Sequence, residues 1–177
     1  MKNKSMEYKT LKEYLEISNL KIYLPNIKIH LFKGVYPPKL DSFLLAKSLE
    51  ISLVKGKKIL DIGTGSGILG IIALKNGASH VVAIDIDKLS IKCAEINAFL
   101  NKVNMDIRQG NLFDPIKKNE LFDLIIANLP TLPTPPKEKF NNYTQNIINA
   151  GFNGRKYLNP LINQSSIYLK EKGFFFE

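Results

Sequence analysis

Three glycines at alternate positions follow a short apolar run, and this stretch constrains the fold more than any other. The run is Lys58–Ile62, with Asp61 near its end, and the glycines are Gly63, Gly65 and Gly67. Such a run is typical of a buried parallel strand. Glycine permits positive φ and close approach of a ligand, and the helix predicted next, Ile68–Lys75, brings unpaired N–H groups to the turn. The stretch therefore predicts a strand–turn–helix unit that binds a nucleotide-like ligand.

Two registers of this turn predict two different ligands. Gly65 to Gly70 formally matches the dinucleotide pattern G-x-G-x-x-G, which is weak evidence on its own. Asp61 to Gly67 matches the D-x-G-x-G-x-G turn of class I methyltransferases. The second register fits the strand end better, because the first leaves Gly63 and Thr64 inside the strand. A G-x-S-x-G nucleophile elbow is excluded, since Thr64 stands where that motif requires glycine.

Strand and helix patterns alternate from residue 57 onward. Predicted strands cover residues 58–62, 80–84, 104–108, 122–127 and 174–176, and predicted helices cover 68–75, the segment after Asp85, and about 157–169. In the middle helix we expect Leu89, Ala94, Ile96, Phe99 and Leu100 to be the buried side. This alternation predicts an α/β fold, a doubly wound, Rossmann-like and mostly parallel sheet with helices on both faces.

The first 33 residues are predicted to form an extension of helix and hairpin ahead of the main domain, which covers residues 34–177. Thr10 to Glu13 is a capping-box pattern at the start of a short helix. Two alternating runs, 20–24 and 27–32, are separated by Pro25 and Asn26 and indicate a hairpin or two short strands. Two prolines, Pro37 and Pro38, then precede a helix that Asp41 or Ser42 can cap.

Composition excludes several classes of protein. Cys93 is the only cysteine, so an internal disulfide is excluded and a reducing, cytoplasmic location is expected. His30 and His80 have no metal-ligand spacing, and we expect no metal site. No apolar run approaches the ~18 residues of a membrane span, and no signal peptide is indicated. The net charge of +9 slightly favours a substrate linked to RNA.

Side chains at the predicted strand ends are candidates for nucleoside contacts. Asp85 follows the second strand, 18 residues after Gly67, where a carboxylate can accept two hydrogen bonds from a ribose diol. Asn111 follows the third strand and could accept from an adenine amino group, with Ile86 and Leu112 on either side of the ring. NAD enzymes and methyltransferases both use an acid at this point, so Asp85 does not choose between them.

The choice between NAD enzymes and methyltransferases depends on the end of the fourth strand, which has the sequence Asn128-Leu129-Pro130-Thr131. With the other motifs, this sequence makes the chain resemble class I S-adenosylmethionine-dependent methyltransferases that act on planar nitrogens, above all release-factor glutamine methyltransferases and small-domain RNA methyltransferases. The resemblance covers residues 30 to 177. Its motifs are Val35-Tyr36-Pro37-Pro38 with Asp41-Ser42 and Leu44-Leu45, Asp61 to Gly67, Asp85, Asn97-Ala98, Gly110 to Phe113, Phe122 to Ile125, Asn128 with Pro130, Gly151-x-x-Gly154 and Lys172-Gly173-Phe174.

The resemblance implies S-adenosylmethionine as cofactor and methyl transfer to a protein glutamine or an RNA base. The implied catalytic residues are Asn128, Leu129 and Pro130; the implied cofactor residues are Asp61, Gly63, Gly65, Gly67, Asp85, Ile86, Asn111, Leu112 and Asn128. In the family the asparagine oxygen and the next carbonyl accept the N–H groups of the substrate. The implied partner is a release factor, a ribosomal protein or RNA, without a membrane.

The chain departs from the family's N-P-P-Y pattern at two positions. Leu129 replaces a proline, and Thr131 replaces the aromatic residue that stacks on a planar target. Tyr36, Phe140 and Tyr143 are candidates to replace that ring. Because of Thr131, a cofactor-binding module without catalysis remains an alternative, and an NAD-dependent oxidoreductase is the third.

The resemblance also implies the strand order 3-2-1-4-5, with 174–176 as the fifth strand and the sixth and seventh strands of the family missing. Three consecutive phenylalanines at an exposed edge require cover on both faces. We therefore expect a domain truncated at its C-terminus, association of copies through the last strand, or cover from the segment before Gly34.

Overall fold

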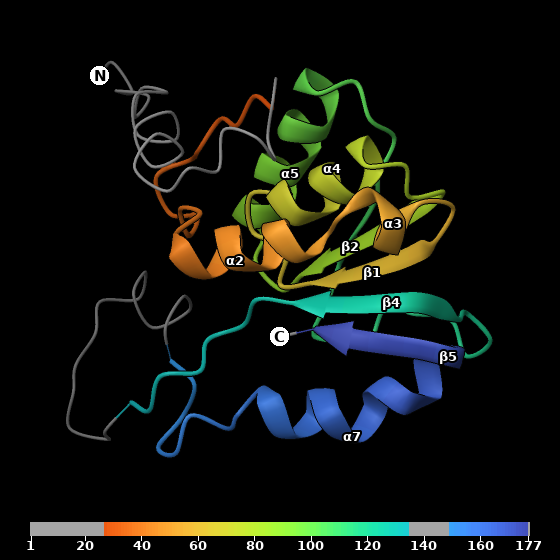
Figure 1. Cartoon of the computed structure of the whole chain (residues 1–177). Helices are drawn as coiled ribbons and strands as arrows, with labels where there is room; N and C mark the ends of the chain where they lie inside the picture. The colour runs from red at the N-terminus through yellow and green to blue at the C-terminus, as the bar shows by residue number, and fades with distance from the viewer. Residues whose placement is uncertain (1–26, 135–148, 177) are drawn as a thin grey trace, which may run out of the picture.

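The computed structural model describes residues 27–134 and 149–176, and it forms an α/β sandwich around one parallel sheet (Figure 1). In chain order the elements are α2 (Leu40–Ser48), α3 (Ile51–Val54), β1 (Lys58–Ile62), α4 (Ile68–Lys75), β2 (His80–Asp85), α5 (Lys88–Leu100), β3 (Asp106–Gln109), β4 (Phe122–Ala127), α7 (Leu158–Tyr168) and β5 (Leu169–Phe176). The predicted helix at Thr10, the run 20–24, Phe140 and Tyr143 lie outside the described residues.

The five strands pair in the order β3-β2-β1-β4-β5, and every pair is parallel. The predicted fold class and strand order are thus confirmed. β1 lies at the centre, with Leu60 opposite Val82 of β2 and Ile125 of β4. The chain therefore reverses its direction of winding between β1 and β4, and a crevice is expected at the carboxyl ends of these strands.

Helices cover both faces of the sheet, as the alternating pattern predicted (Figure 1). On one face Ile59, Val81 and Leu124 pack against residues of α2, α4 and α5. On the other face Leu60, Val82 and Ile125 belong to a second cluster, which includes Leu161 of α7 and the loop residues Leu112, Phe113 and Ile116. Alternate residues of each strand thus enter opposite cores.

The predicted buried side of α5 is wrong at two positions. Phe99 is 81% exposed and Ile96 is 42% exposed, whereas Asn97 is fully buried and Ser90 is 7% exposed. Ser90 donates through its N–H to Asp87, which caps the helix, and Asn97 bonds backbone groups of two other segments. These polar side chains are buried because they have hydrogen-bond partners there, a condition that apolar periodicity does not reveal.

The predicted strand 27–32 is also wrong, because asparagine side chains take the place of a partner strand. The N–H and C=O of Lys28 bond the carboxamide of Asn101, at 2.9 and 2.6 Å. The N–H and C=O of His30 bond the carboxamide of Asn97, at 2.7 and 3.0 Å. Ile29, between them, is 4% exposed and belongs to the main core. The described part of the predicted N-terminal extension therefore packs on α5.

The third and fifth strands differ in extent from their predictions. β3 is Asp106–Gln109 instead of 104–108, and β5 begins at Leu169, five residues before the predicted strand. The pairing of β5 with β4 shifts between Phe122 and Leu124, where Lys172 has φ of 68°. Among the described residues β5 has no neighbour on its outer side. Its final phenylalanines pack on both faces, Phe174 and Phe176 on one and Phe175 on the other.

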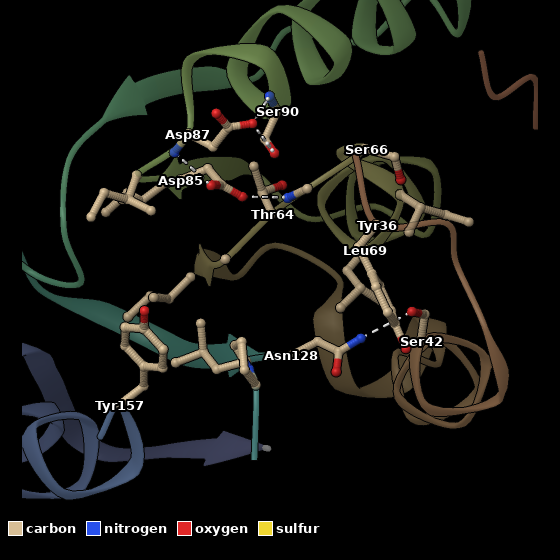
Figure 2. A pocket seen from close by; sticks show the side chains of 18 of the residues that line it. Tyr36, Ser42, Thr64, Ser66, Leu69, Asp85, Asp87, Ser90, Asn128 and Tyr157 are labelled. Atoms are coloured by element: carbon tan, nitrogen blue, oxygen red, sulfur yellow. Dashed lines mark hydrogen bonds between the residues drawn. The ribbon is translucent and has the colours of Figure 1, made fainter. Parts of the chain in front are cut away.

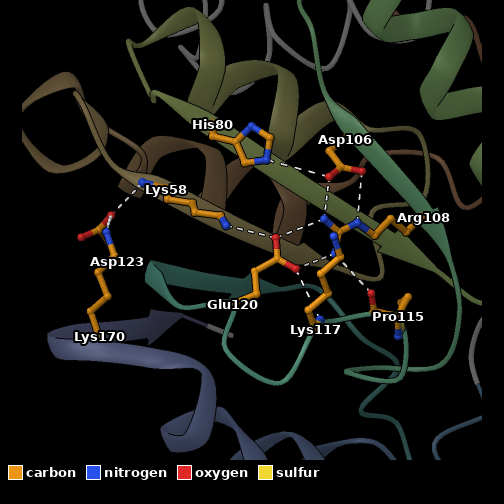
Figure 3. A network of polar contacts seen from close by, with 9 residues as sticks. All are labelled: Lys58, His80, Asp106, Arg108, Pro115, Lys117, Glu120, Asp123 and Lys170. Atoms are coloured by element: carbon orange, nitrogen blue, oxygen red, sulfur yellow. Dashed lines mark hydrogen bonds and ion pairs between the residues drawn. The ribbon is translucent and has the colours of Figure 1, made fainter.

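Ion pairs link neighbouring strands of the sheet, and most of their charged groups lie at or just before the amino ends of β1, β4 and β5 (Figure 3). Glu120, just before β4, accepts from Arg108 of β3 at 2.7 Å and from Lys58 of β1 at 3.0 Å. Arg108 also bonds Asp106 at 2.6 Å, and Lys170 of β5 bonds Asp123 of β4 at 2.8 Å. These charges gather away from the carboxyl ends of the strands, where the functional residues were predicted. No helix of the described segments is long and apolar enough to cross a membrane.

Candidate functional site

A cleft of about 360 Å³ lies at the carboxyl ends of β1, β2 and β4, where the winding of the sheet reverses. Its size is within the usual range for sites that bind small molecules. The predicted site residues that line it are Gly63, Gly65, Asp85, Ile86, Asn111, Leu112, Asn128, Leu129 and Pro130. The fold thus brings together nine of the residues singled out from the sequence, and Asp61 and Gly67 are not part of the lining.

The glycine turn is held against the end of β2. The N–H groups of Gly63 and Thr64 both donate to the carbonyl oxygen of Ile84, at 2.8 and 2.9 Å. The N–H of Gly65 donates to Oδ2 of Asp85 at 2.9 Å. The turn therefore continues the pairing of β1 with β2 beyond the strands and leads directly into the N-terminus of α4.

Each of the three glycines is required for a different reason. A Cβ on Gly63 would lie 2.5 Å from the side chain of Leu129, so this glycine permits the segment after β4 to approach. At Gly65 the reason is the backbone conformation, because φ is +54° while a Cβ there would meet nothing closer than 3.9 Å. Gly67 has φ of +82°, and its Cβ would lie 3.1 Å from the Cα of Ala94. Only the first two face the cleft; Gly67 permits α4 and α5 to pack.

Asp61 supports the turn from below and is fully buried. Its Oδ2 accepts from the hydroxyl of Thr64 at 2.6 Å and from the N–H of Gly70 at 3.2 Å. Burial raises the pKa of this carboxyl to about 6, although both hydrogen bonds act in the opposite direction. Within the described chain its Oδ1 has no hydrogen-bond partner. The structure thus places Asp61 behind the turn, where it holds Thr64.

Asp85 lies at the end of β2 with its carboxylate at the wall of the cleft (Figure 2). One oxygen accepts from Gly65 and the other from the N–H of Asp87, both at 2.9 Å. Burial raises the pKa of Asp85, and the backbone N–H groups oppose that shift. Each oxygen has a second lone pair, so the carboxylate can still accept from a ligand.

Ile86, Asn111 and Leu112 form the side of the cleft next to Asp85. Ile86 is 57% exposed, so its side chain offers apolar surface to the cleft. Leu112 is 8% exposed and has a positive φ of 47°, a conformation that is uncommon for leucine. Asn111 is exposed and follows β3 by two residues, a little beyond the strand end that was predicted.

Asn128, Leu129 and Pro130 follow β4 and line the cleft. Figure 2 shows Asn128 across the cleft from Asp85. Nδ2 of Asn128 donates to the hydroxyl of Ser42, in the first turn of α2, at 2.9 Å. The loop after Thr131 is held by Gly151, whose carbonyl oxygen accepts from the N–H of Thr134 at 2.8 Å. Gly154 has φ of +74° and leaves no room for a Cβ beside the carbonyl of Thr131. This contact explains why glycine is needed at position 154.

Two aromatic residues line the cleft, Tyr36 and Tyr157, within the described residues. Tyr36 was a candidate to replace the ring missing at Thr131. Tyr157 was not, since nothing in its local sequence indicates a site; only the position of α7 brings it there (Figure 2). Ser42 was predicted as a possible helix cap and as part of the Asp41-Ser42 motif, but its contact with Asn128 was missed.

A parallel sheet of this order, with a glycine turn after β1 and an acid after β2, defines a class of enzymes that bind a nucleoside-containing cofactor. Comparison with known proteins agrees. Residues 44–133 match the family described as ribosomal protein L11 methyltransferase (PrmA). The protein of Methanocaldococcus jannaschii named "Putative protein N5-glutamine methyltransferase MJ0928" is 38% identical over 152 residues, 86% of this chain and 75% of that protein.

Two further similarities concern L11 methyltransferases. That of Lactobacillus johnsonii is 46% identical over 87 residues, 49% of this chain and 27% of that protein. The crystal structure of the L11 methylase of Lactobacillus delbrueckii subsp. bulgaricus has a TM-score of 0.62 at 30% identity, covering 83% of this chain and 65% of the other. This chain thus spans only part of the length of these relatives. It belongs to the class I S-adenosylmethionine-dependent methyltransferases, so the cofactor of its family is S-adenosylmethionine and not a dinucleotide.

The cleft has the features that this cofactor requires. Gly65 leaves open space beside the turn, and the N-terminus of α4 is adjacent. Asp85 offers a carboxylate for a ribose, and Ile86 and Leu112 offer apolar surface for a base. The residues present therefore fit the group, with Gly63, Gly65 and Asp85 as those that would hold it. No cluster of three or more possible metal ligands occurs in the described segments.

Proposed function

We propose that this protein methylates the side-chain amide nitrogen of a glutamine in a protein. The observation that carries the proposal is the position of Asn128, which follows β4 and lines the same cleft as the glycine turn and Asp85. The relative from M. jannaschii, 38% identical over most of this chain, supports glutamine as the acceptor. A ribosomal protein or a release factor is the proposed class of partner.

Asn128 and Leu129 would hold the acceptor nitrogen. Oδ1 of Asn128 and the carbonyl oxygen of Leu129 are acceptors on adjacent residues, and they can receive the two N–H groups of a primary amide. These two hydrogen bonds localise the amide lone pair on the nitrogen and fix the direction in which the lone pair points. S-adenosylmethionine, when bound, supplies a methyl group on a sulfonium that such a nitrogen can attack. The chain contributes position and electrostatics, with no side chain as nucleophile.

The leucine at position 129 is compatible with this role. Its side chain packs on Gly63, so contact with the glycine turn restrains the segment that a proline would otherwise stiffen. Thr131 is exposed and gives no ring, so stacking must come from elsewhere. Tyr36 and Tyr157 are the rings of the described chain that line the cleft, and they are the proposed replacements.

A planar nitrogen of an RNA base is the second candidate acceptor. The net charge of +9 favours it, because basic proteins attract the phosphate backbone. The threonine at position 131 favours glutamine, since a flat base depends more on stacking than a primary amide does.

The test is methyl transfer from isotopically labelled cofactor to three acceptors: ribosomal protein L11, synthetic peptides that each carry one glutamine, and ribosomal RNA. We expect label in protein or peptide, on a glutamine nitrogen by mass spectrometry. Asn128→Ala should reduce turnover ~10²–10³-fold, as for loss of one preorganised hydrogen bond, while calorimetry shows unchanged affinity for S-adenosylhomocysteine. Label in RNA alone would favour the second candidate. Cofactor binding without transfer to any acceptor would favour an inactive module.

A further inference from the structure

The hydroxyl of Ser42 connects the catalytic segment to the start of α2. Ser42 is 4% exposed, and its Oγ accepts from Nδ2 of Asn128 at 2.9 Å, although 86 residues separate the two along the chain. The same oxygen accepts from the N–H of Lys39 at 3.4 Å. The hydroxyl proton is directed to Oδ1 of Asp41, also at 3.4 Å. One donor and two acceptor positions are all that a hydroxyl has, so the capacity of Ser42 is fully used.

The partners of Ser42 cannot exchange their roles. The carboxylate of Asp41 only accepts, and the backbone N–H of Lys39 only donates. The position of Asp41 is itself fixed, because its Oδ1 accepts from the N–H of Ser42 at 2.7 Å and its Oδ2 from the hydroxyl of Tyr36 at 3.3 Å. Ser42 therefore has only a lone pair to offer Asn128, and the carboxamide must present its NH₂ group.

We infer that Asp41 and Ser42 are positioning residues that decide which end of the Asn128 carboxamide is left for the substrate. A carboxamide is nearly symmetric in shape, and rotation by half a turn exchanges an acceptor for a donor. With NH₂ bound to Ser42, Oδ1 is the free end, and within the described chain no hydrogen bond occupies it. A substrate nitrogen that carries hydrogen then meets an acceptor. In the opposite orientation it would meet two N–H donors and be repelled.

This inference rests on the proposed function, because it requires Oδ1 of Asn128 to accept from the substrate. It goes beyond that function by explaining how the acceptor is selected before any substrate arrives. Neither residue needs to touch the reacting nitrogen. The sequence order Asp41-Ser42 in the first turn of a helix places the carboxylate beside the hydroxyl, and two prolines before the helix fix the approach of the chain.

The first measurement needs no substrate. In ¹⁵N-labelled protein, the side-chain NH₂ signals of Asn128 are identified by their loss in Asn128→Ala. We expect them to show slow exchange with solvent in the wild type, and to exchange faster and shift in Ser42→Ala. Ser42→Thr, which retains the hydroxyl, should restore them. Asp41→Asn should also shift these signals. This variant has the same shape as the wild type, so it tests the inference even if the methyl group of Ser42→Thr does not fit. Ser48→Ala removes a hydroxyl from the other end of α2 and should change nothing.

The second measurement is turnover with the glutamine peptides. Ser42→Ala should lower kcat about tenfold, the effect of one hydrogen bond of about 1.4 kcal/mol. The affinity for S-adenosylhomocysteine should remain, and Ser42→Thr should recover kcat. Unchanged Asn128 signals in Ser42→Ala and Asp41→Asn would overturn the inference. Full turnover in Asn128→Ala would instead overturn the proposed function, and the amide signals would then decide alone whether Ser42 orients this side chain.

Discussion

Nδ2 of Asn97 donates to the carbonyl oxygen of Ser66 at 2.8 Å, so α5 holds the glycine turn from the side away from the cleft. The same carboxamide bonds both backbone groups of His30. One buried side chain therefore connects the turn to the segment that precedes α2. Its neighbour one helical turn later, Asn101, bonds Lys28 in the same manner but does not reach the turn.

Asn97→Ala should lower both the melting temperature and the cofactor affinity. It removes the hydrogen bonds that Asn97 makes to the carbonyl oxygen of Ser66 and to the N–H and C=O of His30, and a buried group left unsatisfied costs ~1–3 kcal/mol. Asn101→Ala is the matched control, because it removes the bonds to Lys28 and to the carbonyl oxygen of Asn97 but leaves the bond between Asn97 and Ser66 in place. Thermal unfolding should show a loss in both variants, and calorimetry with S-adenosylhomocysteine should show a loss only in the first. Equal affinities would contradict a role of Asn97 in holding the turn.

Gly67→Ala and Gly65→Ala should separate packing from binding. Both place an L-residue at positive φ, at a cost of ~1–2 kcal/mol. In Gly67→Ala the new methyl also meets the backbone of Ala94 at 3.1 Å, so this variant should have the lower melting temperature. In Gly65→Ala the methyl lies in the cleft, and this variant should bind S-adenosylhomocysteine more weakly. The reverse pattern would mean that Gly67, and not Gly65, faces the cofactor.

Asp85→Ala should weaken cofactor binding by ~1.5–3 kcal/mol, as for loss of hydrogen bonds to a charged group. The variant also releases the N–H of Gly65, so part of the effect comes from a less ordered turn. Asp85→Asn retains an acceptor and should have an intermediate dissociation constant for S-adenosylhomocysteine. A dissociation constant unchanged by Asp85→Ala would rule out the assignment of this carboxylate to the ribose.

Glu120→Gln should destabilise the protein by about 2 kcal/mol at neutral pH, because charge-assisted bonds to Arg108 and Lys58 are lost. Hydrogen bonds from Arg108 lower the pKa of Glu120 to about 2, with a smaller contribution from Lys58. A folded-state pKa below the ordinary value of 4.5 means that this stability is complete above about pH 4.5 and is lost as the pH falls toward 2. Urea unfolding of the wild type and of Glu120→Gln over this pH range tests whether the stability falls with pH as expected.

The matched control for this prediction is Asp123→Asn, which breaks the ion pair with Lys170. That lysine is 45% exposed, so the pair is worth less than a buried one. If the wild type and Glu120→Gln lose stability in parallel as the pH falls, the network near Glu120 does not contribute the expected stability.

The central strands were predictable because their sequences are continuous apolar runs. β1, α4 and β4 have the bounds that were expected, since a buried parallel strand has no polar face to confuse the pattern. The edge strands were less accurate, as β3 and β5 show. Their side chains are partly exposed, so hydrophobicity does not mark their ends.

The site was predictable where its residues lie in one motif and not where distant segments meet. The glycine turn and Asp85 follow strand ends, and strand ends of a parallel sheet meet at one edge. Asn97 was read only as part of a family motif, because its partners Ser66 and His30 are 31 and 67 residues away. Ser42 belongs to a motif, but its contact with Asn128 depends on where α2 packs. Tyr157, just before α7, has no local pattern that indicates the cleft.

The pairing of β1 with β4 also determines the order in which the chain can assemble. β1 meets β2 after a short crossover, so the half-sheet β3-β2-β1 can form early. The other side of β1 stays unpaired until β4 is synthesised, because Ile59 pairs with Leu124 of β4. During synthesis at ~5–20 residues per second, a bare apolar edge in the middle of the future sheet therefore persists for seconds. Rapid arrival of β4 protects the nascent chain from pairing with the wrong strand.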